Sequence, residues 1–553
     1  MFCSSLEAKP PTLTHLYPAG GNAGSEIDLE FVGSFDDWPP KIWLSTSDLT
    51  VSFSDKKGDG KIKIDETALP GPRLIRCYNA EGSSVPCFFI VSNTPESLEK
   101  EPNDHPNKAT PLTALPTVVN GRLSKRGDTD SFRIDLKKGQ WLIAELHAYR
   151  LRSTVDPLLQ IVDSDGIKVA FNHDHYQLDP FLTFQAKRDD TFAVQVLGFD
   201  YPAKSDVRLG GGKSFIYRLK LNSGPYLAHT YPLALQHGKS NPVRFEGWNL
   251  ISPVSEITIP DMPVSPVSNT DPFVVHLDKG TSGFNIPISP HPQLTEQDTD
   301  ESDRQKLPIP GGVSGKITSH DEEDRYEVFL EKDVSVTFAA KTEAPIHQFD
   351  AWIAIESNEG KRLKRDDDSR QGRDPSLSWT ATTSGPHILT IGNVLRTGSP
   401  NFYYHLTAEK NLPRYTANIA INQITLQRGA TNEISINFKR QHSHSSPMSF
   451  RFENLPVSIQ QIGGDLSEKD SSPKIQLITS TNAPPFLGEI SLHATDLTTK
   501  VHRVVPATFL GTSVNNGVPG GFNDLILTET SSLWLTIPPV APAKDEAAKD
   551  PAP

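Results

Sequence analysis

The chain has 553 residues, of which 36% are hydrophobic and 22% charged, and its formal net charge is −13. At ~100–200 residues per domain, this length predicts three to five domains. The acidic balance argues against nucleic-acid binding, which needs a basic surface. The sequence has no run of ~18 apolar residues and therefore predicts no membrane-spanning segment. Three cysteines, without a Cys/His cluster of structural-zinc spacing, exclude a disulfide-dense miniprotein and a zinc-ribbon array.

The first residues, 1–8, have the form of the end of a secretory signal. Leu6-Glu7-Ala8, followed by Lys9-Pro10-Pro11, has the form of a cleavage region, but the charged start and most of the apolar segment of a full signal are missing. We therefore expect a truncated signal peptide and a protein that is secreted, periplasmic or on the cell surface. The alternative is a short disordered N-terminus of a cytoplasmic protein.

Two kinds of segment occur twice along the chain. The longer one matches at positions 194 residues apart, which are Gly121/Gly315, Asp130/Asp324, Asp156/Asp350, Gly166/Gly360 and Asp174/Asp368. The shorter one matches at positions 214 apart, which are Tyr17/Tyr231, Pro18/Pro232, Gly24/Gly238 and Phe31/Phe245. With Pro-, Ser- and Asn-rich or acidic joints as boundaries, the sequence predicts domains at 9–93, 94–222, 223–293, 294–410 and 411–540, and a disordered tail at 541–553.

Nearly all of the hydrophobic periodicity has a period of two. Stretches such as 131–136, 215–221 and 433–438 alternate apolar and polar residues, which is typical of half-buried antiparallel strands. Pairs such as Asp165-Gly166 between these stretches are typical of hairpin turns. The sequence therefore predicts an all-β protein, a string of about five β-sandwich domains.

The longer repeat resembles a known family. The residues that carry the resemblance are Glu101-Pro102-Asn103-Asp104, Gly121-Arg122-Leu123, Gly127-Asp128-Thr129-Asp130-Ser131-Phe132, Asp156-Pro157, Asp163-Ser164-Asp165-Gly166 and the alternation of Phe215, Tyr217 and Leu219. They are similar to the bacterial pre-peptidase C-terminal (PPC) domain, over about residues 95–222 and more weakly over 294–410. The resemblance implies a jelly-roll-like β-sandwich of the kind appended to secreted proteases and other exported bacterial proteins.

The shorter repeat resembles a second family more loosely. The stretch from Leu13 to Gly21 opens like an Ig-like IPT/TIG sandwich, and 223–293 follows the same pattern. Residues 411–540 look like the Ig-like units that follow such domains in large exported bacterial proteins. The resemblances together imply Ig-like and PPC-like sandwiches that alternate along the chain.

The PPC resemblance also implies a calcium site in the first copy. Ca²⁺ takes six to eight oxygen ligands, many of them carboxylates, and in collagenase relatives of the family the entry linker and an acidic turn together hold calcium. Carried over motif by motif, the ligands are Glu99, Glu101, Asn103, Asp104, Asp128 and Asp130. The alternative is a solvated linker beside ordinary turn residues.

The second copy departs from this pattern and predicts a weaker site. Glu296-Gln297-Asp298 stands in place of Glu-Pro-Asn-Asp, and Glu322 stands in place of Asp128. The residues of this weaker metal site are Glu296, Asp298, Glu322 and Asp324.

Cys77 and Cys87 flank a segment whose midpoint is Gly82. A symmetric hairpin would place the two cysteines opposite one another, at a Cβ separation slightly wider than a disulfide needs. Export favours a bridge. Two free thiols packed as small apolar residues are the equal alternative.

No motif for an enzyme emerges from the sequence. His-Glu-x-x-His and Gly-x-Ser-x-Gly are absent, and His173-Asp174-His175 is better explained as a solvated loop than as a metal site. We therefore expect a non-catalytic binding or spacer module with an extracellular protein or polysaccharide as its partner. Two alternatives remain open: an accessory or targeting subunit of a secreted protease or other hydrolase, and a carbohydrate-binding protein that uses aromatic residues such as Trp141, Trp352 or Trp379, although these three fit core strands better.

Overall fold

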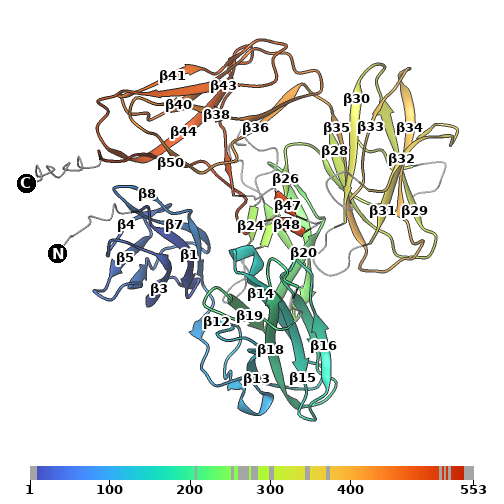
Figure 1. Ribbon diagram of the computed structural model, residues 1–553. Helices are drawn as coiled ribbons and strands as arrows, with labels where there is room; N and C mark the ends of the chain where they lie inside the picture. Colours follow the sequence, from blue (N-terminus) through green and yellow to red (C-terminus); the bar gives the residue numbers. More distant parts are fainter. Residues whose placement is uncertain are drawn as a thin grey trace, which may run out of the picture. The chain divides into compact units, whose positions relative to one another are not determined.

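The computed structural model describes residues 9–205, 208–250, 254–258, 273–275, 284–297, 304–342, 349–368, 374–509, 513–515, 518–520 and 525–540. The expected signal remnant with Cys3, the expected tail and Asp298 lie outside the described residues. Strands dominate, and the helical elements of the described residues are two short 3₁₀ turns, η1 (Pro106–Lys108) and η2 (Tyr149–Leu151). The protein is thus an all-β string of β-sandwiches (Figure 1).

The first sandwich consists of two sheets, ordered β1-β3-β6-β5 and β2-β9-β7-β4, with β8 paired to β7. Its strands are β1 (Thr12–Tyr17), β2 (Gly20–Asn22), β3 (Glu26–Ser34), β4 (Lys41–Leu44), β5 (Leu49–Phe53), β6 (Asp59–Ile64), β7 (Gly71–Asn79), β8 (Gly82–Ser83) and β9 (Cys87–Ser92). Alternate residues of β6 point inward, and Ile62 and Ile64 lie in a core with Phe31 and Phe89. The period-two pattern therefore places one face of each sheet in the core.

The second sandwich has two five-stranded sheets, ordered β10-β12-β19-β14-β17 and β11-β13-β18-β15-β16. Its strands are β10 (Glu96–Leu98), β11 (Thr110–Pro111), β12 (Thr117–Arg122), β13 (Asp130–Leu136), β14 (Trp141–His147), β15 (Val155–Val162), β16 (Lys168–Asn172), β17 (Phe181–Gln185), β18 (Asp190–Asp200) and β19 (Ile216–Asn222). Phe132, Leu159 and Leu219 lie in the core between the sheets.

The third sandwich is described in part. It contains a β20-β22-β23 sheet and the pairs β21-β26 and β24-β25. The strands are β20 (Tyr226–Tyr231), β21 (Leu235–Gln236), β22 (Ser240–Trp248), β23 (Val254–Thr258), β24 (Phe273–Val275), β25 (Phe284–Ile286) and β26 (Ile288–Ser289). β20 pairs with β22 as β1 pairs with β3, and the bulge between Leu13 and His15 recurs between Leu227 and His229.

The fourth sandwich repeats the strand order of the second. Its sheets run β27-β28-β35-β30-β33 and β29-β34-β31-β32. The strands are β27 (Gln293–Thr295), β28 (Gly311–Lys316), β29 (Glu323–Leu330), β30 (Ser335–Lys341), β31 (Ala351–Ser357), β32 (Arg362–Asp366), β33 (Ser376–Thr380), β34 (Gly385–Asn393) and β35 (Tyr403–Lys410). Among the described residues, every strand of the second sandwich except β11 has a counterpart strand in the fourth. In the place of β11, the fourth sandwich has a single β-bridge between Lys306 and Glu327.

The C-terminal sandwich is built around a sheet ordered β37-β50-β44-β40-β42, with β45 paired to β44, and around the sheet β38-β43-β41. The pairs β36-β39 and β46-β49 accompany these sheets, and β47-β48 forms a separate two-stranded sheet. The strands are β36 (Arg414–Asn418), β37 (Gln423–Thr425), β38 (Thr431–Ser435), β39 (Asn437–Gln441), β40 (Met448–Glu453), β41 (Ile459–Gly463), β42 (Asp465–Leu466), β43 (Lys474–Thr479), β44 (Phe486–Asp496), β45 (His502–Val504), β46 (Ala507–Thr508), β47 (Ser513–Asn515), β48 (Val518–Gly520), β49 (Glu529–Thr530) and β50 (Leu533–Ile537).

The chain forms two compact units, 1–221 together with 414–553, and 222–413. Within the first unit the C-terminal sandwich contacts the first one. The guanidinium of the buried Arg76 donates to the backbone oxygen of Asn422 (2.9 Å), and the rings of Tyr78 and Trp534 lie 4.8 Å apart. Sequence order and spatial grouping therefore differ in this unit.

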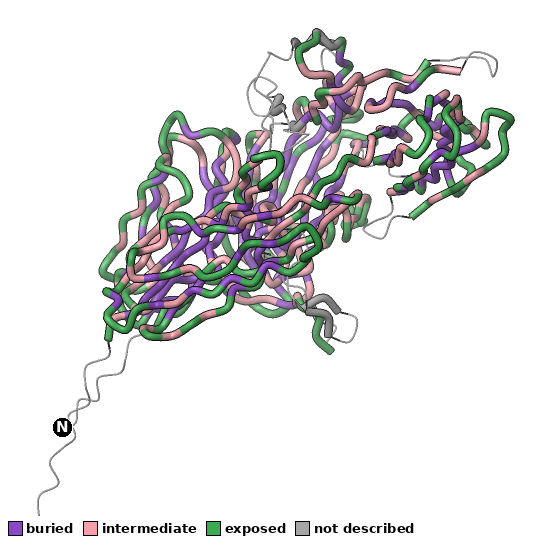
Figure 2. The backbone as a smooth tube through the Cα atoms, turned by 90° about the horizontal axis from the view of Figure 1, so that it is seen from above, coloured by how far each residue is buried: buried purple, intermediate pink, exposed green. Residues whose placement is uncertain are grey.

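Buried residues follow the strand interiors, and exposed residues gather at the turns (Figure 2). This distribution is what half-buried strands of antiparallel sandwiches produce. Within the described residues, none of the helices has the length and apolar character needed to span a membrane.

Candidate metal centre

The entry linker of the second sandwich folds back over the turn before β13. The backbone N–H of Ser131 donates to the carbonyl of Asn103 (3.2 Å), which fixes the linker beside the start of that strand. Carboxylate oxygens of Glu101, Asp104 and Asp128 consequently lie within 4.8 Å of one another. The structure therefore brings the predicted linker and the predicted acidic turn together.

The deeper half of the cluster consists of Glu99, Asp130 and a residue that the sequence analysis did not assign to the site, Tyr217. The Tyr217 hydroxyl donates to Asp130 Oδ2 (2.6 Å) and lies 3.3 Å from Glu99 Oε2. The backbone N–H of Arg122 donates to Glu99 Oε1 (2.8 Å). Asp130 and Tyr217 are buried, so this half is shielded from solvent.

The Asn103 amide is fully buried and faces the same carboxylates. In one orientation its nitrogen donates to Asp130 Oδ1 (3.1 Å) and Glu101 Oε2 (3.3 Å). In the reverse orientation three oxygens converge, and a proton on one carboxyl or a bound cation would satisfy them.

One oxygen of Asp128 lacks a hydrogen-bond donor. Asp128 is fully buried, and its Oδ2 accepts from the backbone N–H groups of Ser124 (2.5 Å) and Lys125 (3.3 Å). Its Oδ1 is buried and accepts no hydrogen bond from the described residues, while the Lys125 ammonium lies 3.6 Å away. A buried carboxylate oxygen without a donor is costly, and a bound cation would satisfy it.

Burial and mutual repulsion raise the proton affinity of the cluster. Burial, followed by the neighbouring Glu99, raises the pKa of Asp130 to about 10. Burial also raises the pKa of Glu99, and burial together with Asp104 raises that of Asp128. The cluster as it stands therefore favours a bound positive charge, either a proton or a metal ion.

The second copy builds the same inner half. The Tyr404 hydroxyl donates to Asp324 Oδ2 (2.6 Å), as Tyr217 does to Asp130. The backbone N–H of Lys316 donates to Glu296 Oε2 (2.9 Å), as that of Arg122 does to Glu99. Glu296 is thus the counterpart of Glu99. The sequence comparison aligned Glu296 with the first residue of the Glu-Pro-Asn-Asp segment, Glu101, and that alignment is wrong by two residues.

Glu322 is the counterpart of Asp128, as the sequence predicts. Its Oε2 accepts from the backbone N–H groups of Thr318 (2.9 Å) and Ser319 (2.5 Å). Single oxygens of Glu296, Glu322 and Asp324 lie within 4.8 Å of one another. Burial, followed by Glu296, raises the pKa of Asp324 to about 8.

The repeated glycines have a packing reason that also identifies the tyrosines. A Cβ atom on Gly121 would lie 2.1 Å from the Tyr217 ring, and one on Gly315 would lie 2.2 Å from the Tyr404 hydroxyl. Only glycine lets each tyrosine cross the neighbouring strand and reach its aspartate. The sequence pattern of Phe215, Tyr217 and Leu219 included this tyrosine. The pattern could not show that its hydroxyl binds Asp130, which lies 87 residues away in the sequence.

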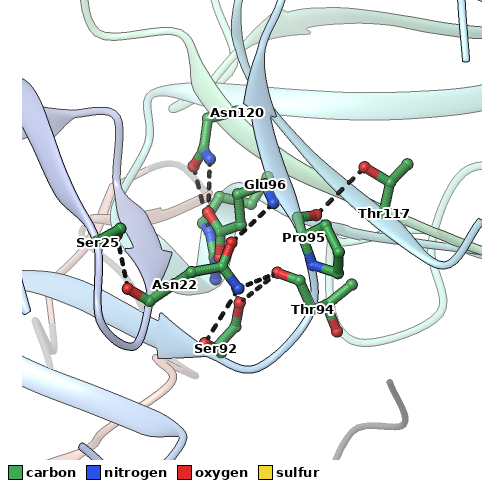
Figure 3. A network of polar contacts seen from close by, with 9 residues as sticks. Asn22, Ser25, Ser92, Thr94, Pro95, Glu96, Thr117 and Asn120 are labelled. Atoms are coloured by element: carbon green, nitrogen blue, oxygen red, sulfur yellow. Dashed lines mark hydrogen bonds and ion pairs between the residues drawn. The ribbon is translucent and has the colours of Figure 1, made fainter. Parts of the chain in front are cut away.

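A polar network joins the first two sandwiches immediately before the cluster (Figure 3). Glu96 lies at its centre. Its carboxylate forms an ion pair with Arg218 and accepts from Asn120 (2.7 Å) and Ser92 (2.5 Å), and its backbone N–H donates to Asn22 Oδ1 (2.9 Å). The side chains of Glu96 and Arg218 are 6% and 5% exposed, so this ion pair is buried at the joint.

A second contact at this joint recurs in the other unit. Arg122 lies over the ring of Tyr17, with its guanidinium carbon 4.0 Å from the ring centroid. In the second unit, Lys316 lies over the ring of Tyr231 (5.2 Å), and the Tyr231 hydroxyl donates to the carbonyl of Ser314 (3.1 Å). In both units, the tyrosine that precedes a proline (Tyr17 or Tyr231) thus contacts the cationic residue that follows the repeated glycine (Arg122 or Lys316).

Cys77 and Cys87 are free thiols, which is the second of the two alternatives left open by the sequence, and the strands do not place them opposite one another. Cys87 pairs with Ile75, and Cys77 pairs with Ile42 on the other neighbouring strand. Both are buried, and burial raises the pKa of Cys87 to about 12. Protonated, buried thiols of this kind are unreactive.

The aromatic residues considered for sugar stacking are mostly core residues. Trp352 is buried, and Trp379 packs against the core of the fourth sandwich, while Trp141 is half-buried. In the loop with His173, the imidazole Nε2 lies 3.5 Å from Asp156 and its Nδ1 lies 3.1 Å from Asp174.

No family model matches this chain, and no curated protein matches it. One similar solved structure contains the fibronectin(III)-like modules of Clostridium thermocellum CbhA, with 10% identity over 43% of this chain and 93% of that one and a TM-score of 0.13. Another contains the M60 catalytic domain with the CBM51-1 and CBM51-2 domains of Clostridium perfringens ZmpB, with 10% identity over 74% of this chain and 55% of that one and a TM-score of 0.14. At these scores neither likeness carries an argument about function.

Proposed function

We propose that this protein is an exported, non-catalytic array of β-sandwiches that acts as a binding or spacer module at the cell surface or in the periplasm, with joints stiffened by calcium. The observation that carries this proposal is the repeated joint. The contacts of Tyr17, Arg122 and Glu99 recur with Tyr231, Lys316 and Glu296. A chain that builds the same fixed joint twice is suited to holding modules at a set spacing.

The linker that carries the joint also carries the metal cluster. Glu96 is fixed between the first two sandwiches, and Glu99 and Glu101 follow within five residues. A calcium ion held by the linker and by the turn before β13 would fix the linker to the second sandwich. Because the cluster carries several buried carboxylates, the metal-free joint would be looser than the calcium-bound one.

Calcium is expected to suppress an unusual pH dependence of stability. The pKa of Asp130 is raised to about 10 and that of Asp324 to about 8, so the folded state holds protons that the unfolded chain has lost. The stability from these protonated groups is complete below the unfolded aspartate pKa of ~3.9 and is lost as the pH rises towards the folded values. In EDTA the melting temperature should therefore fall between about pH 6 and pH 9.

Saturating Ca²⁺ should flatten that slope and raise the melting temperature at alkaline pH. At a calcium concentration 100-fold above Kd, linkage adds about 2.7 kcal/mol to the free energy of unfolding. Calorimetric titration of the full chain in buffers of different ionisation enthalpy should show that protons are released on binding. Asp130→Asn should lose the part of this response that the first cluster contributes, whereas Asp189→Asn, which removes an exposed carboxylate paired with Lys137, should keep all of it. Absence of both heat and thermal shift would exclude calcium.

The partner of the array is proposed to be an extracellular protein or a polysaccharide. Binding of the labelled full chain to purified cell-wall and matrix polysaccharides, beside a proteolytic-activity assay of the same preparation, tests the proposal. Saturable binding without turnover supports a binding module. Hydrolysis of a substrate by the pure chain would overturn the non-catalytic role.

A further inference from the structure

The outer face of the C-terminal sandwich carries two histidines and a glutamate on three neighbouring strands. Glu453 ends β40, His493 lies on β44 and His502 begins β45. β40 and β44 run side by side (Figure 1), and β45 pairs with the other edge of β44. One ligand atom from each of the three side chains lies within 4.8 Å of the other two.

The separations of these atoms are those of ion pairs and also match the spacing of ligands around one metal ion. Nε2 of His493 lies 3.3 Å from Glu453 Oε2, and Nε2 of His502 lies 3.4 Å from Glu453 Oε1. Hydrogen-bonded N–H···O pairs prefer about 2.7–3.2 Å. Ligand atoms bound to one tetrahedral zinc ion at ~2.0–2.1 Å lie roughly 3.3–3.4 Å apart.

Both imidazoles place Nε2 beside the same carboxylate. Each Nε2 lies within 3.4 Å of a Glu453 oxygen, and the two rings stack with centroids 4.6 Å apart and planes at 14°. A shared ion would lie in the plane of each ring, so its binding would turn one ring out of the stack. Nδ1 of His502 lies 2.8 Å from Thr495 Oγ1. When that nitrogen donates its proton to Thr495, Nε2 keeps the lone pair that a metal ion needs.

His493 contacts a hydroxyl on its own strand, and its register partners on the two neighbouring strands are an ion-paired arginine and an uncharged valine. Its Nε2 lies 2.9 Å from Ser491 Oγ, and its Nδ1 is buried without a hydrogen-bond partner among the described residues. Opposite it on β40, Arg451 is neutralised by Asp465, with donor distances of 2.6 and 2.7 Å. Its other strand neighbour, Val504, is uncharged.

We propose that Glu453, His493 and His502 form a surface site for a divalent transition-metal ion of the Zn²⁺ class. Two imidazoles and a carboxylate suit zinc, copper or nickel rather than calcium or magnesium. Glu453 and His502 are each half-exposed, so a fourth position is open to water or to a ligand. The ion would cross-link β40, β44 and the three-residue strand β45.

Titration of the full chain with Zn²⁺ in excess Ca²⁺ tests this site, because the hard cation occupies carboxylate clusters and leaves imidazoles free. We expect one site that His493→Ala or His502→Ala abolishes and that Thr495→Val weakens about tenfold, as the loss of a ligand-orienting contact does. Co²⁺ should give visible absorption bands that disappear in the same variants.

Two histidine variants serve as controls. His320→Ala removes an exposed imidazole that pairs with Asp321, and His173→Ala removes the imidazole beside Asp156 and Asp174. Both should bind Zn²⁺ as the wild type does, with unchanged circular dichroism in all variants. Wild-type affinity retained in the His493 and His502 variants, or no Zn²⁺ binding by the unaltered chain, would overturn the proposal.

Discussion

Replacing Arg218 with methionine is expected to lower the free energy of unfolding of the second sandwich by about 3–5 kcal/mol, the usual cost of leaving one partner of a buried ion pair uncompensated. The substitution leaves the Glu96 carboxylate 6% exposed and without its guanidinium. Arg218 also donates to Asn120 Oδ1 (3.2 Å), so a second buried polar group loses its partner. Hydrogen exchange of the β12 and β19 amides, resolved by peptide, measures the loss locally.

The double variant Glu96→Gln/Arg218→Met should recover much of that loss, because it removes both charges. Arg188→Met is the exposed control. Its guanidinium pairs with three carboxylates, but it is 55% exposed, and such pairs contribute about 0–1 kcal/mol. Equal protection in Arg218→Met and the wild type would show that the joint does not depend on this ion pair.

Replacing Asp179 with alanine should destabilise the same sandwich by about 3–5 kcal/mol, because buried donors to a charged group lose their acceptor together. Asp179 is fully buried and accepts from the backbone N–H groups of Ala148 (2.9 Å), Tyr149 (2.7 Å) and Arg150 (3.2 Å) and from Arg150 Nε (2.8 Å). These donors belong to the start of η2. Urea denaturation should show a lower midpoint for the transition of this sandwich.

The counterpart in the second copy provides a matched comparison. Among the described residues, Asp374 accepts from Thr342 alone, through its backbone N–H (3.1 Å) and its hydroxyl (2.9 Å), and Asp374 is half-buried. Asp374→Ala should therefore cost about 1–2 kcal/mol, the range for two ordinary hydrogen bonds. If both alanine variants unfold at the same urea concentration, the backbone donors at η2 do not account for the effect.

Much of the fold could be predicted because the repeat preserves residues with rigid packing needs. Gly121 and Gly315 leave room for a tyrosine ring, and Asp130 and Asp324 accept from that tyrosine. Such requirements survive sequence divergence, so matches at a spacing of 194 residues pointed to two sandwiches of one strand order.

The predictions failed where a contact depends on a register that the sequence does not display. Glu296 was matched to the wrong segment, because the linker sequence differs between the two copies. What the copies share is a hydrogen bond, in which Glu296 accepts from the backbone N–H of Lys316. For the cysteines, the bridged one of the two open alternatives required a symmetric hairpin, and the pairing of Cys87 with Ile75 breaks that symmetry. Glu453, His493 and His502 form no short motif, because three separate strands carry them.

The grouping of 1–221 with 414–553 has a consequence for biosynthesis. Arg76 emerges from the ribosome early, yet its acceptor Asn422 is made 346 residues later. At ~5–20 residues per second of translation, the nascent first sandwich waits roughly 20–70 seconds with this cation lacking its acceptor. A chaperone would have this interval in which to hold the chain, and a ribosome stalled before residue 414 would leave the first unit incomplete.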